Sequence, residues 1–164
     1  MFYWVTSKIF WIPFYAFLLY LIAKKWGKQT FIIGVFVGLV FLLGDRISVM
    51  AFKDVFQRLR PCHNPEIANL VHLVDGCGGK FGFVSSHASN SFAFALFIGL
   101  LFRKYYRFIL PLMIIWAALV SYSRIYVGVH YPGDILCGGI LGTVIGIFVY
   151  WLMKICNKRF NLNL

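Results

Sequence analysis

Residues 132–153 have the sequence PGDILCGGILGTVIGIFVYWLM, and this stretch decides the class of fold. After Asp134 it runs for 19 residues without a charge, from Ile135 to Met153. A helix needs about 20 apolar residues to cross the hydrocarbon core of a bilayer. The stretch therefore predicts a membrane-spanning helix, which begins at Pro132 because proline favours the first helical turn.

Four further segments have the same apolar character, at residues 4–23, 30–50, 87–102 and 108–122. The last two are short for full spans, and they fit if their outer ends lie below the membrane surface beside a polar site. Of the 164 residues, 61% are hydrophobic and 13% are charged. A soluble domain is roughly 45–50% apolar and about 25% charged. The composition therefore argues against a soluble enzyme, a disordered tail or a collagen-like fibre.

These segments predict an all-α protein, a polytopic transmembrane helical bundle of about five spans. Residues 1–164 are expected to form a single domain, with the polar stretch 51–86 as its outer loop. The start of the chain, Met1-Phe2-Tyr3-Trp4, lacks the cationic region of a cleaved signal peptide. Because the predicted topology places Met1 outside, a second interpretation is a six-span protein that lacks its first helix.

The positive charges indicate the topology. The formal net charge is +11, from 16 Lys and Arg against 5 Asp and Glu. Nine of the cations lie in residues 24–28, 103–107 and 154–159, three stretches that contain no acid. Basic loops face the cytoplasm, so the acids and all four histidines are expected at the opposite, outer side. The charge thus reflects topology, and no nucleic acid is expected as a partner.

Three polar clusters at the outer side interrupt the apolar pattern, and the first joins Lys53 to Arg60-Pro61. Seven residues are two helical turns, so both cations can face one way on a helix. Together they are suited to bind an oxyanion, because Arg60 offers a planar guanidinium with forked donors and Lys53 offers a compact ammonium charge. The alternative is that they bind lipid headgroups. Two other cations, Arg58 and Lys80, are interpreted as solvated loop residues that could touch a substrate headgroup.

The second cluster is Val84-Ser85-Ser86-His87, directly before an apolar run. Serines at the start of a helix leave backbone N–H groups, and the helix dipole favours an anion there. His87 then lies at the edge of the anion site and can donate a proton near neutral pH. The alternative is a helix cap followed by an interfacial histidine.

The third cluster contains Ser123-Arg124, His130 and Asp134. His130 and Asp134 are four residues apart at a helix start and can form a hydrogen bond. A carboxylate on one imidazole nitrogen fixes the tautomer and leaves the other nitrogen free to attack. Arg124 adds a third cation. The alternative is a buried ion network, although polar groups buried in membranes are seldom kept for packing alone.

Together the clusters provide three cations, two histidines, one carboxylate and a helix start. This combination suits a phosphate ester. The cations and N–H groups stabilise charge on the phosphoryl oxygens, one histidine attacks phosphorus, and the other protonates the leaving oxygen. The sequence has no carboxylate cluster of the kind that holds Mg²⁺, so no metal and no other cofactor is expected.

The clusters resemble the signature of the type-2 phosphatidic acid phosphatase superfamily of integral membrane phosphatases, K-x6-R-P, P-S-G-H and S-R-x5-H-x3-D. The first and third parts are complete here. In the second part, Val84 stands where proline is usual and Ser86 where glycine is usual. The signature spans residues 53–134, about half of the chain.

The resemblance implies a role for each matching residue. It implies three catalytic residues: His130 as the nucleophile that forms a phosphohistidine, Asp134 as the group that orients it, and His87 as the acid for the leaving group. The residues implied to bind phosphate are Lys53, Arg60, Ser85, Ser86 and Arg124. The family usually has six spans, which also suggests that one helix is missing here.

We therefore expect a metal-independent lipid phosphatase whose partners are the bilayer and a phosphorylated lipid. Candidate substrates are undecaprenyl diphosphate, phosphatidylglycerophosphate, phosphatidic acid and lipid A phosphates. The expected location is a bacterial inner membrane, with the active site facing the periplasm. The alternatives are a lipid phosphotransferase with the same intermediate and a non-catalytic anionic-lipid binder or transporter.

Glycines also recur at four-residue spacing, in the pair Gly34 and Gly38 and in the trio Gly138, Gly142 and Gly146. Such a stripe on an apolar helix lets another helix approach closely. The partner helix can belong to the same chain, which is the simpler interpretation, or to a second copy in a homo-oligomer.

Two cysteines, Cys62 and Cys77, lie in the expected outer loop. On that side of a membrane they can be oxidised, and a disulfide between them would brace the loop. A metal site that combines them with His63 and His72 is a weaker alternative, because phosphohistidine chemistry needs no metal.

Overall fold

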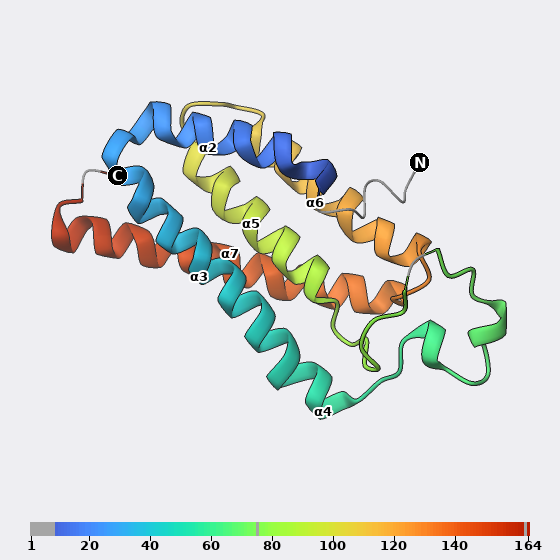
Figure 1. The fold of residues 1–164 in the computed structure, drawn as a ribbon. Coiled ribbons are helices and arrows are strands. Elements are labelled where there is room, and N and C mark those ends of the chain that lie inside the picture. Colours follow the sequence, from blue (N-terminus) through green and yellow to red (C-terminus); the bar gives the residue numbers. More distant parts are fainter. Residues whose placement is uncertain (1–8, 75, 163) are drawn as a thin grey trace.

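Five helices carry the apolar segments (Figure 1) within residues 9–74, 76–162 and 164, which the computed structural model describes. They are α2 (Ile12–Trp26), α3 (Thr30–Ile47), α5 (Ser86–Phe102), α6 (Ile109–Tyr126) and α7 (Pro132–Phe160). Shorter turns extend or join them: η1 (Ile9–Trp11), η2 (Gly27–Gln29), η3 (Ser48–Lys53), α4 (Asp54–Phe56), η4 (Pro61–His63) and η5 (Ala68–Leu70). Met1 and the first residues of the predicted segment 4–23 lie outside the described residues.

Three helical stretches are long and apolar enough to cross a membrane. They are residues 9–56, which include both α2 and α3, and the helices α6 and α7. The apolar helix α5 is shorter. The predicted all-α bundle of apolar helices is therefore confirmed, and the number of crossings stays a prediction.

Successive helices run in alternating directions, so the connections gather at two ends (Figure 1). At one end lie the turn between α2 and α3, the link between α5 and α6, and the end of α7. These are the three basic stretches 24–28, 103–107 and 154–159. At the other end α3 and α6 finish, and α5 and α7 begin. The structure thus separates the basic stretches from the polar clusters, as the charge pattern predicts.

Helix α5 lies at the centre of the bundle and packs against α3, α6 and α7. Twelve of its 17 residues are buried. A helix that is apolar on all sides needs protein or lipid around its whole circumference. Here the neighbouring helices supply that cover. This explains how α5, which corresponds to the second-shortest predicted apolar segment, can lie at the centre of the bundle.

The glycine trio on α7 sets the distance between α7 and α5. A Cβ atom added to Gly138 would lie 2.7 Å from the backbone oxygen of Ser85. Cβ atoms at Gly142 and Gly146 would fall on backbone oxygens further along α5. Contact within the chain is therefore confirmed for this stripe. Nothing lies within 4 Å of a Cβ added to Gly34 or Gly38, so a homo-oligomer through that pair stays a prediction.

The segment after α3 differs from the prediction. The helix does not stop at Met50 but continues through η3 and α4 to Phe56, where Gln57 adopts a left-handed conformation with φ of 47°. Arg60 is extended, because the proline that follows it disfavours the helical conformation. The prediction that Lys53 and Arg60 share one helix face is therefore wrong.

We predict that Gly142→Ala destabilises the protein, because the added methyl group would meet the backbone of Ser89. Overpacking of this kind costs about 1–3 kcal/mol. Thermal unfolding in detergent, followed by circular dichroism, measures the change. The matched control is Gly38→Ala, which should be neutral or stabilising by roughly 0.5–1 kcal/mol, as alanine is in a helix. Equal unfolding temperatures for the two variants would contradict the close contact between α5 and α7.

Candidate active site

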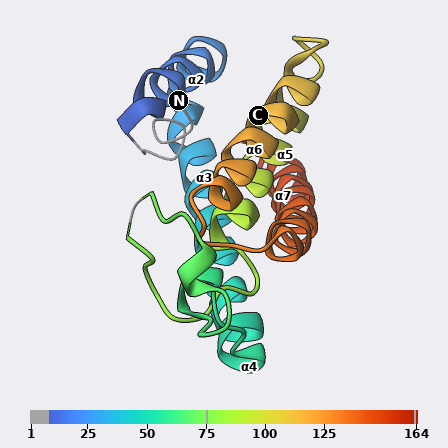
Figure 2. The same ribbon diagram turned by 90° about the vertical axis from the view of Figure 1, so that its right-hand side faces the viewer.

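The three polar clusters meet at the end of the bundle where α5 and α7 begin. Figure 2 looks onto this end and shows residues 57–74 and 76–85 there, in green. Two backbone hydrogen bonds fold the segment back on itself, from Gly82 N–H to Arg58 O at 2.8 Å and from Arg60 N–H to Lys80 O at 3.2 Å. This reversal returns Arg60 to the site, although no helix connects it to Lys53.

His130 and Asp134 form a buried pair. His130 is 3% exposed and Asp134 is fully buried. The expected hydrogen bond is present, with 3.3 Å between His130 Nδ1 and Asp134 Oδ2. The same oxygen accepts from the backbone N–H of Tyr131 at 2.8 Å. The carboxylate is therefore fixed by the first turn of α7, and it fixes the imidazole in turn.

Arg58 is an exposed loop residue, as predicted, but its side chain is also paired with Asp134, which was not predicted. Its Nη2 atom donates to the second carboxylate oxygen of Asp134, Oδ1. Its guanidinium carbon lies 4.8 Å from the centre of the Phe83 ring and 5.1 Å from that of Tyr131. The position of Arg58 inside the first cluster, two residues before Arg60, was the only available signal in the sequence.

Lys53 lies at the end of η3 and donates from Nζ to Ser86 Oγ at 2.8 Å. Ser86 Oγ is 2.7 Å from Ser48 Oγ, which donates to the backbone oxygen of Asp45 at 3.0 Å. These groups can form a chain of hydrogen bonds in which Lys53 donates to Ser86, Ser86 donates to Ser48, and Ser48 donates to the backbone. Ser48 was not predicted as part of the site; it is a fully buried hydroxyl near the end of a predicted apolar span.

Arg60 is held by the backbone of the loop. Its Nη1 atom donates to Cys77 O at 2.8 Å and its Nε atom to Phe81 O at 3.4 Å. Cys62 and Cys77 form a disulfide, so the carbonyl that receives Arg60 belongs to a cross-linked loop. Since both cysteines are oxidised, neither is available as a thiolate, which removes the basis of the alternative metal site.

Ser85 joins the second cluster to the third. It is the N-cap of α5, and its Oγ accepts from Ala88 N–H at 3.4 Å. Its own N–H donates to the backbone oxygen of Asp134 at 3.1 Å. The starts of α5 and α7 are therefore bonded directly, which places the first turn of α5 next to the His130 pair.

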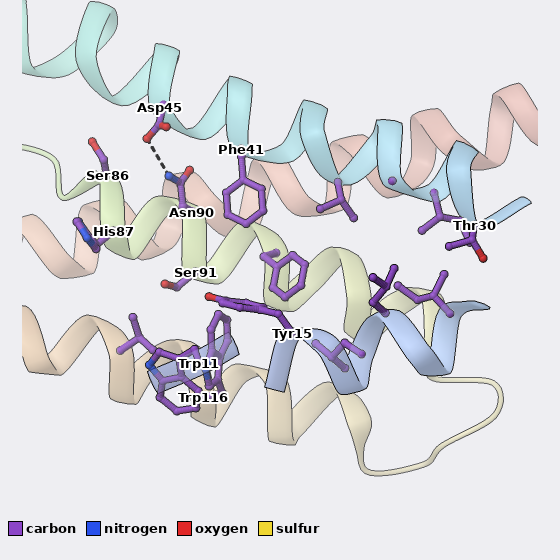
Figure 3. Close-up of a pocket in the computed structure, with 18 residues that line it drawn as sticks. Trp11, Tyr15, Thr30, Phe41, Asp45, Ser86, His87, Asn90, Ser91 and Trp116 are labelled. Atoms are coloured by element: carbon purple, nitrogen blue, oxygen red, sulfur yellow. Dashed lines mark hydrogen bonds between the residues drawn. The ribbon is translucent and has the colours of Figure 1, made fainter. Parts of the chain in front are cut away.

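His87 follows in the first turn of α5 and is exposed. Figure 3 shows it with Ser86 at one end of a cavity between the helices. At the same end Asn90 donates from Nδ2 to Asp45 Oδ1 at 2.8 Å (Figure 3). His87 thus lies between the polar cluster and the apolar interior of the bundle.

The charges around His130 determine its protonation. Burial lowers the pKa of His130, and the positive charges of Arg60 and Arg124 lower it further, whereas the hydrogen bond to Asp134 opposes the shift. The ring is therefore neutral at neutral pH. If Nδ1–H donates to Asp134, the lone pair lies on Nε2. Arg58 contacts Asp134, and the charges of Arg60 and Arg124 act on His130. Three guanidinium groups thus accompany one carboxylate, an excess of positive charge that suits a phosphate.

A match to the PAP2 superfamily covers residues 29–158. The chain belongs to the PAP2 superfamily of membrane lipid phosphatases. The resemblance seen in the sequence is thereby confirmed, and the matched range contains all three polar clusters. As a PAP2 protein, the chain is an integral membrane protein with apolar helical spans.

Two PAP2 relatives share a name. The lipid A 4'-phosphatase of Bacteroides thetaiotaomicron is 40% identical over 90% of this chain and 66% of its own length. The lipid A 4'-phosphatase of Porphyromonas gingivalis is 42% identical over 96% of this chain and 67% of its own length. The chain therefore spans about two thirds of the length of these relatives.

A solved PAP2 structure has the same fold. It is the crystal structure of a transmembrane PAP2 type phosphatidylglycerolphosphate phosphatase from Bacillus subtilis. The two superpose with a TM-score of 0.63 over 91% of this chain and 71% of that chain, at 22% identity. The predicted transmembrane helical fold is confirmed by this likeness.

We predict that Asp134→Asn lowers the pKa of His130 below its already lowered value. The carboxylate is the group that favours the protonated ring, so its loss leaves burial and the two arginines unopposed. NMR titration of labelled histidine in detergent measures the pKa. Asp54→Asn is the control, since Asp54 is exposed and lies on α4 outside the pair. A pKa that rises in Asp134→Asn would contradict this description of the site.

Proposed function

We propose that the chain is a lipid phosphatase that hydrolyses a phosphomonoester through a phosphohistidine at His130. The observation that carries the proposal is the buried His130–Asp134 pair, which lies among cations from two distant parts of the chain, residues 53–60 and Arg124. The proposal assigns three groups to catalysis, His130, Asp134 and His87. It assigns phosphate binding to Lys53, Arg60, Ser85, Ser86 and Arg124.

In the first step, Nε2 of His130 attacks phosphorus and the bond from phosphorus to the lipid oxygen breaks. His87 gives its proton to that oxygen, so the lipid leaves as an alcohol. The ring of His130 becomes cationic when the P–N bond forms. Asp134 stabilises this charge through the hydrogen bond at Nδ1, as a carboxylate behind an imidazole does in other nucleophilic sites.

In the second step, water attacks the phosphohistidine. His87, now neutral, takes a proton from the water, and the P–N bond breaks. Inorganic phosphate and neutral His130 result, so protons and charges balance over the cycle. Lys53, Arg60 and Arg124 stabilise the charge on the phosphoryl oxygens in both steps. Ser86 contributes its backbone N–H at the start of α5, and Ser85 its hydroxyl proton.

The proposed substrate is a phosphorylated glycolipid of the lipid A type. Two relatives at 40% and 42% identity are named for that activity, and this supports it over undecaprenyl diphosphate, phosphatidylglycerophosphate and phosphatidic acid. The proposed location is the inner membrane of a bacterium, with the site at the periplasmic face, because the basic stretches lie at the opposite end. Five spans, or six with a first helix outside this chain, fit the alternating helices.

We predict that His130→Ala abolishes phosphate release from lipid A phosphate, with a loss of about 10³-fold or more, because the nucleophile is removed. The assay measures inorganic phosphate from a panel that also contains the three other lipids and a water-soluble phosphomonoester. His63→Ala is the matched control, since His63 is exposed and its ring bonds to Gly78 O in the same loop. Vanadate should inhibit the native protein, and EDTA should not.

Turnover by His130→Ala would overturn the proposed mechanism. Preference for the soluble phosphomonoester over every lipid would overturn the substrate class. Product analysis with an added lipid alcohol separates hydrolysis from transfer, because a transferase would form a new phosphorylated lipid in place of inorganic phosphate.

We predict that replacing Cys62 and Cys77 together by serine weakens vanadate inhibition about tenfold. A disulfide that closes a loop of this length restricts the chain by about 3 kcal/mol. Without it, the Cys77 carbonyl that receives Arg60 is held less firmly. A reducing agent should have the same effect on the native protein. The paired replacement of Cys137 and Cys156, which are free cysteines, is the control, and unchanged vanadate inhibition in the loop variant would contradict this role for the disulfide.

A further inference from the structure

Asp45 is an acidic residue near the end of the apolar helix α3, and the two catalytic steps do not use it. We propose that its carboxylate faces the leaving group of the substrate and selects a neutral, hydrogen-bond-donating leaving group over an anionic one. The inference rests on the proposed function, in which His87 protonates the leaving oxygen. It adds a residue that distinguishes the phosphomonoester of a sugar from a lipid diphosphate.

Asp45 lies within residues 9–56, a stretch that is long and apolar enough to cross a membrane. The helical path continues beyond it through η3 and α4 to Phe56. An ionisable side chain in such a stretch is costly and marks a functional site by default. The adjacent Arg46 does not neutralise it, because Asp45 forms no ion pair with any cation among the described residues. Its carboxylate is therefore not explained by a structural salt bridge.

Helix α5 holds this carboxylate in place. Asp45 Oδ1 accepts from Asn90 Nδ2 at 2.8 Å. The amide of Asn90 lies against Gly44, where an added Cβ atom would fall on Asn90 Oδ1. The bond thus depends on the missing side chain at position 44. Asp45 Oδ2 has no hydrogen-bond partner in the part of the chain that the structure describes, so one oxygen is fixed and the other is available to a ligand.

The fixed carboxylate borders the leaving-group side of the site. Asp45, Asn90, Ser86 and His87 line the same end of a cavity of about 710 Å³ (Figure 3). Asn90 follows His87 by three residues on α5, a spacing at which side chains on a helix are neighbours. Ser48 also connects the backbone oxygen of Asp45 to Ser86 Oγ. The group that leaves as His87 protonates it must therefore pass beside Asp45.

A carboxylate at this position favours a leaving group that donates hydrogen bonds. A sugar released from its phosphate is a neutral alcohol that carries further hydroxyl or amide groups close to the broken bond. A hydrogen bond from such a donor to Asp45 Oδ2 is charge-assisted and roughly twice as strong as a neutral one. A prenyl alcohol has no second donor and gains nothing from Asp45.

The same charge disfavours a lipid diphosphate. When His130 takes the terminal phosphoryl group, the bond from phosphorus to the bridging oxygen breaks. The leaving group is then a lipid monophosphate, which is an anion and lies next to Asp45. Like charges repel strongly where little water separates them. Asp45 would therefore select by repulsion as well as by attraction, a combination that specific sites commonly use.

The experiment measures kcat/KM of the native protein and of Asp45→Asn in detergent, for undecaprenyl diphosphate and undecaprenyl monophosphate. The two lipids share one hydrocarbon chain, so their ratio removes its contribution. In Asp45→Asn the value for the diphosphate should rise about tenfold, and the value for the monophosphate should stay unchanged. An unchanged ratio of diphosphate to monophosphate would overturn the proposed repulsion.

Lipid A phosphate tests the proposed hydrogen bond. Its kcat/KM should fall about fivefold in Asp45→Asn, because a charge-assisted bond becomes a neutral one. Undecaprenyl monophosphate, whose leaving alcohol has no second donor, is the control substrate. An equal effect on the two monophosphates would overturn the assignment of a donor on the leaving group.

Asp54→Asn is the matched control variant. The charges of Asp45 and Asp54 both act on Lys53, but Asp54 is exposed on α4 and does not line the cavity. Asp54→Asn should leave the ratio of diphosphate to monophosphate unchanged, and Asp45→Glu, which keeps the charge, should retain the native preference. An equal rise of the ratio in both asparagine variants would show a general gain of positive charge and would overturn the proposal.

A binding measurement lets the role of Asp45 and the proposed function fail separately. Calorimetry in a His130→Ala background compares the affinities for inorganic diphosphate and inorganic phosphate. Adding Asp45→Asn should raise the affinity for diphosphate about tenfold and leave that for phosphate unchanged. If the native protein releases no phosphate from any lipid, the proposed function fails, while this ratio of affinities still decides whether Asp45 repels a second anionic group. An unchanged ratio would overturn that repulsion.

Discussion

The arrangement of the site depends on one buried carboxylate, that of Asp134. Its two oxygens accept from His130 Nδ1, from the Tyr131 backbone and from Arg58, and its backbone oxygen accepts from Ser85. A buried carboxylate is tolerated only when charges and hydrogen bonds surround it. By meeting that requirement, Asp134 joins the start of α7, the start of α5 and the long loop. The ring of His130 is oriented by the same bonds that hold these elements together.

The contact between α5 and α7 extends this constraint through the membrane-embedded part. The glycines of α7 let the backbones of the two helices touch along several turns, so the helix starts cannot slide relative to one another. Glycine is a weak helix former, so these residues lower the stability of α7 as a helix. In return they allow the close contact that fixes the position of α7 along α5. The position of Ser85 against Asp134 is therefore maintained by packing far below the polar cluster.

Local features of the site could be predicted from the sequence, because spacing within one helical turn determines them. Proline at the start of α7 and the bond between His130 and Asp134 are of this kind. The relation of Lys53 to Arg60 was not predictable, since it depends on Gln57 leaving the helix. The partners of Arg58 and Ser48 lie 76 and 38 residues away in the chain. No periodicity indicates such contacts, which only the tertiary fold creates.

For the fold as a whole, the sequence likewise predicted the helices but not all of their contacts. Apolar length and the distribution of basic residues determined the helices and their alternating directions. Which helix lies at the centre was less evident, because α5 is distinguished only by being apolar on every side. Serines near its start, which resemble a surface feature in the sequence, are buried by its neighbours.

The disulfide in the long loop has a consequence for the timing of assembly. Cysteines stay reduced in the cytosol and are oxidised outside it. Cys62 and Cys77 can therefore pair only after the loop has reached an oxidising compartment, and Arg60 receives its cross-linked anchor at that moment. A newly synthesised chain would carry all the residues of its site and yet complete that site only once the loop is oxidised.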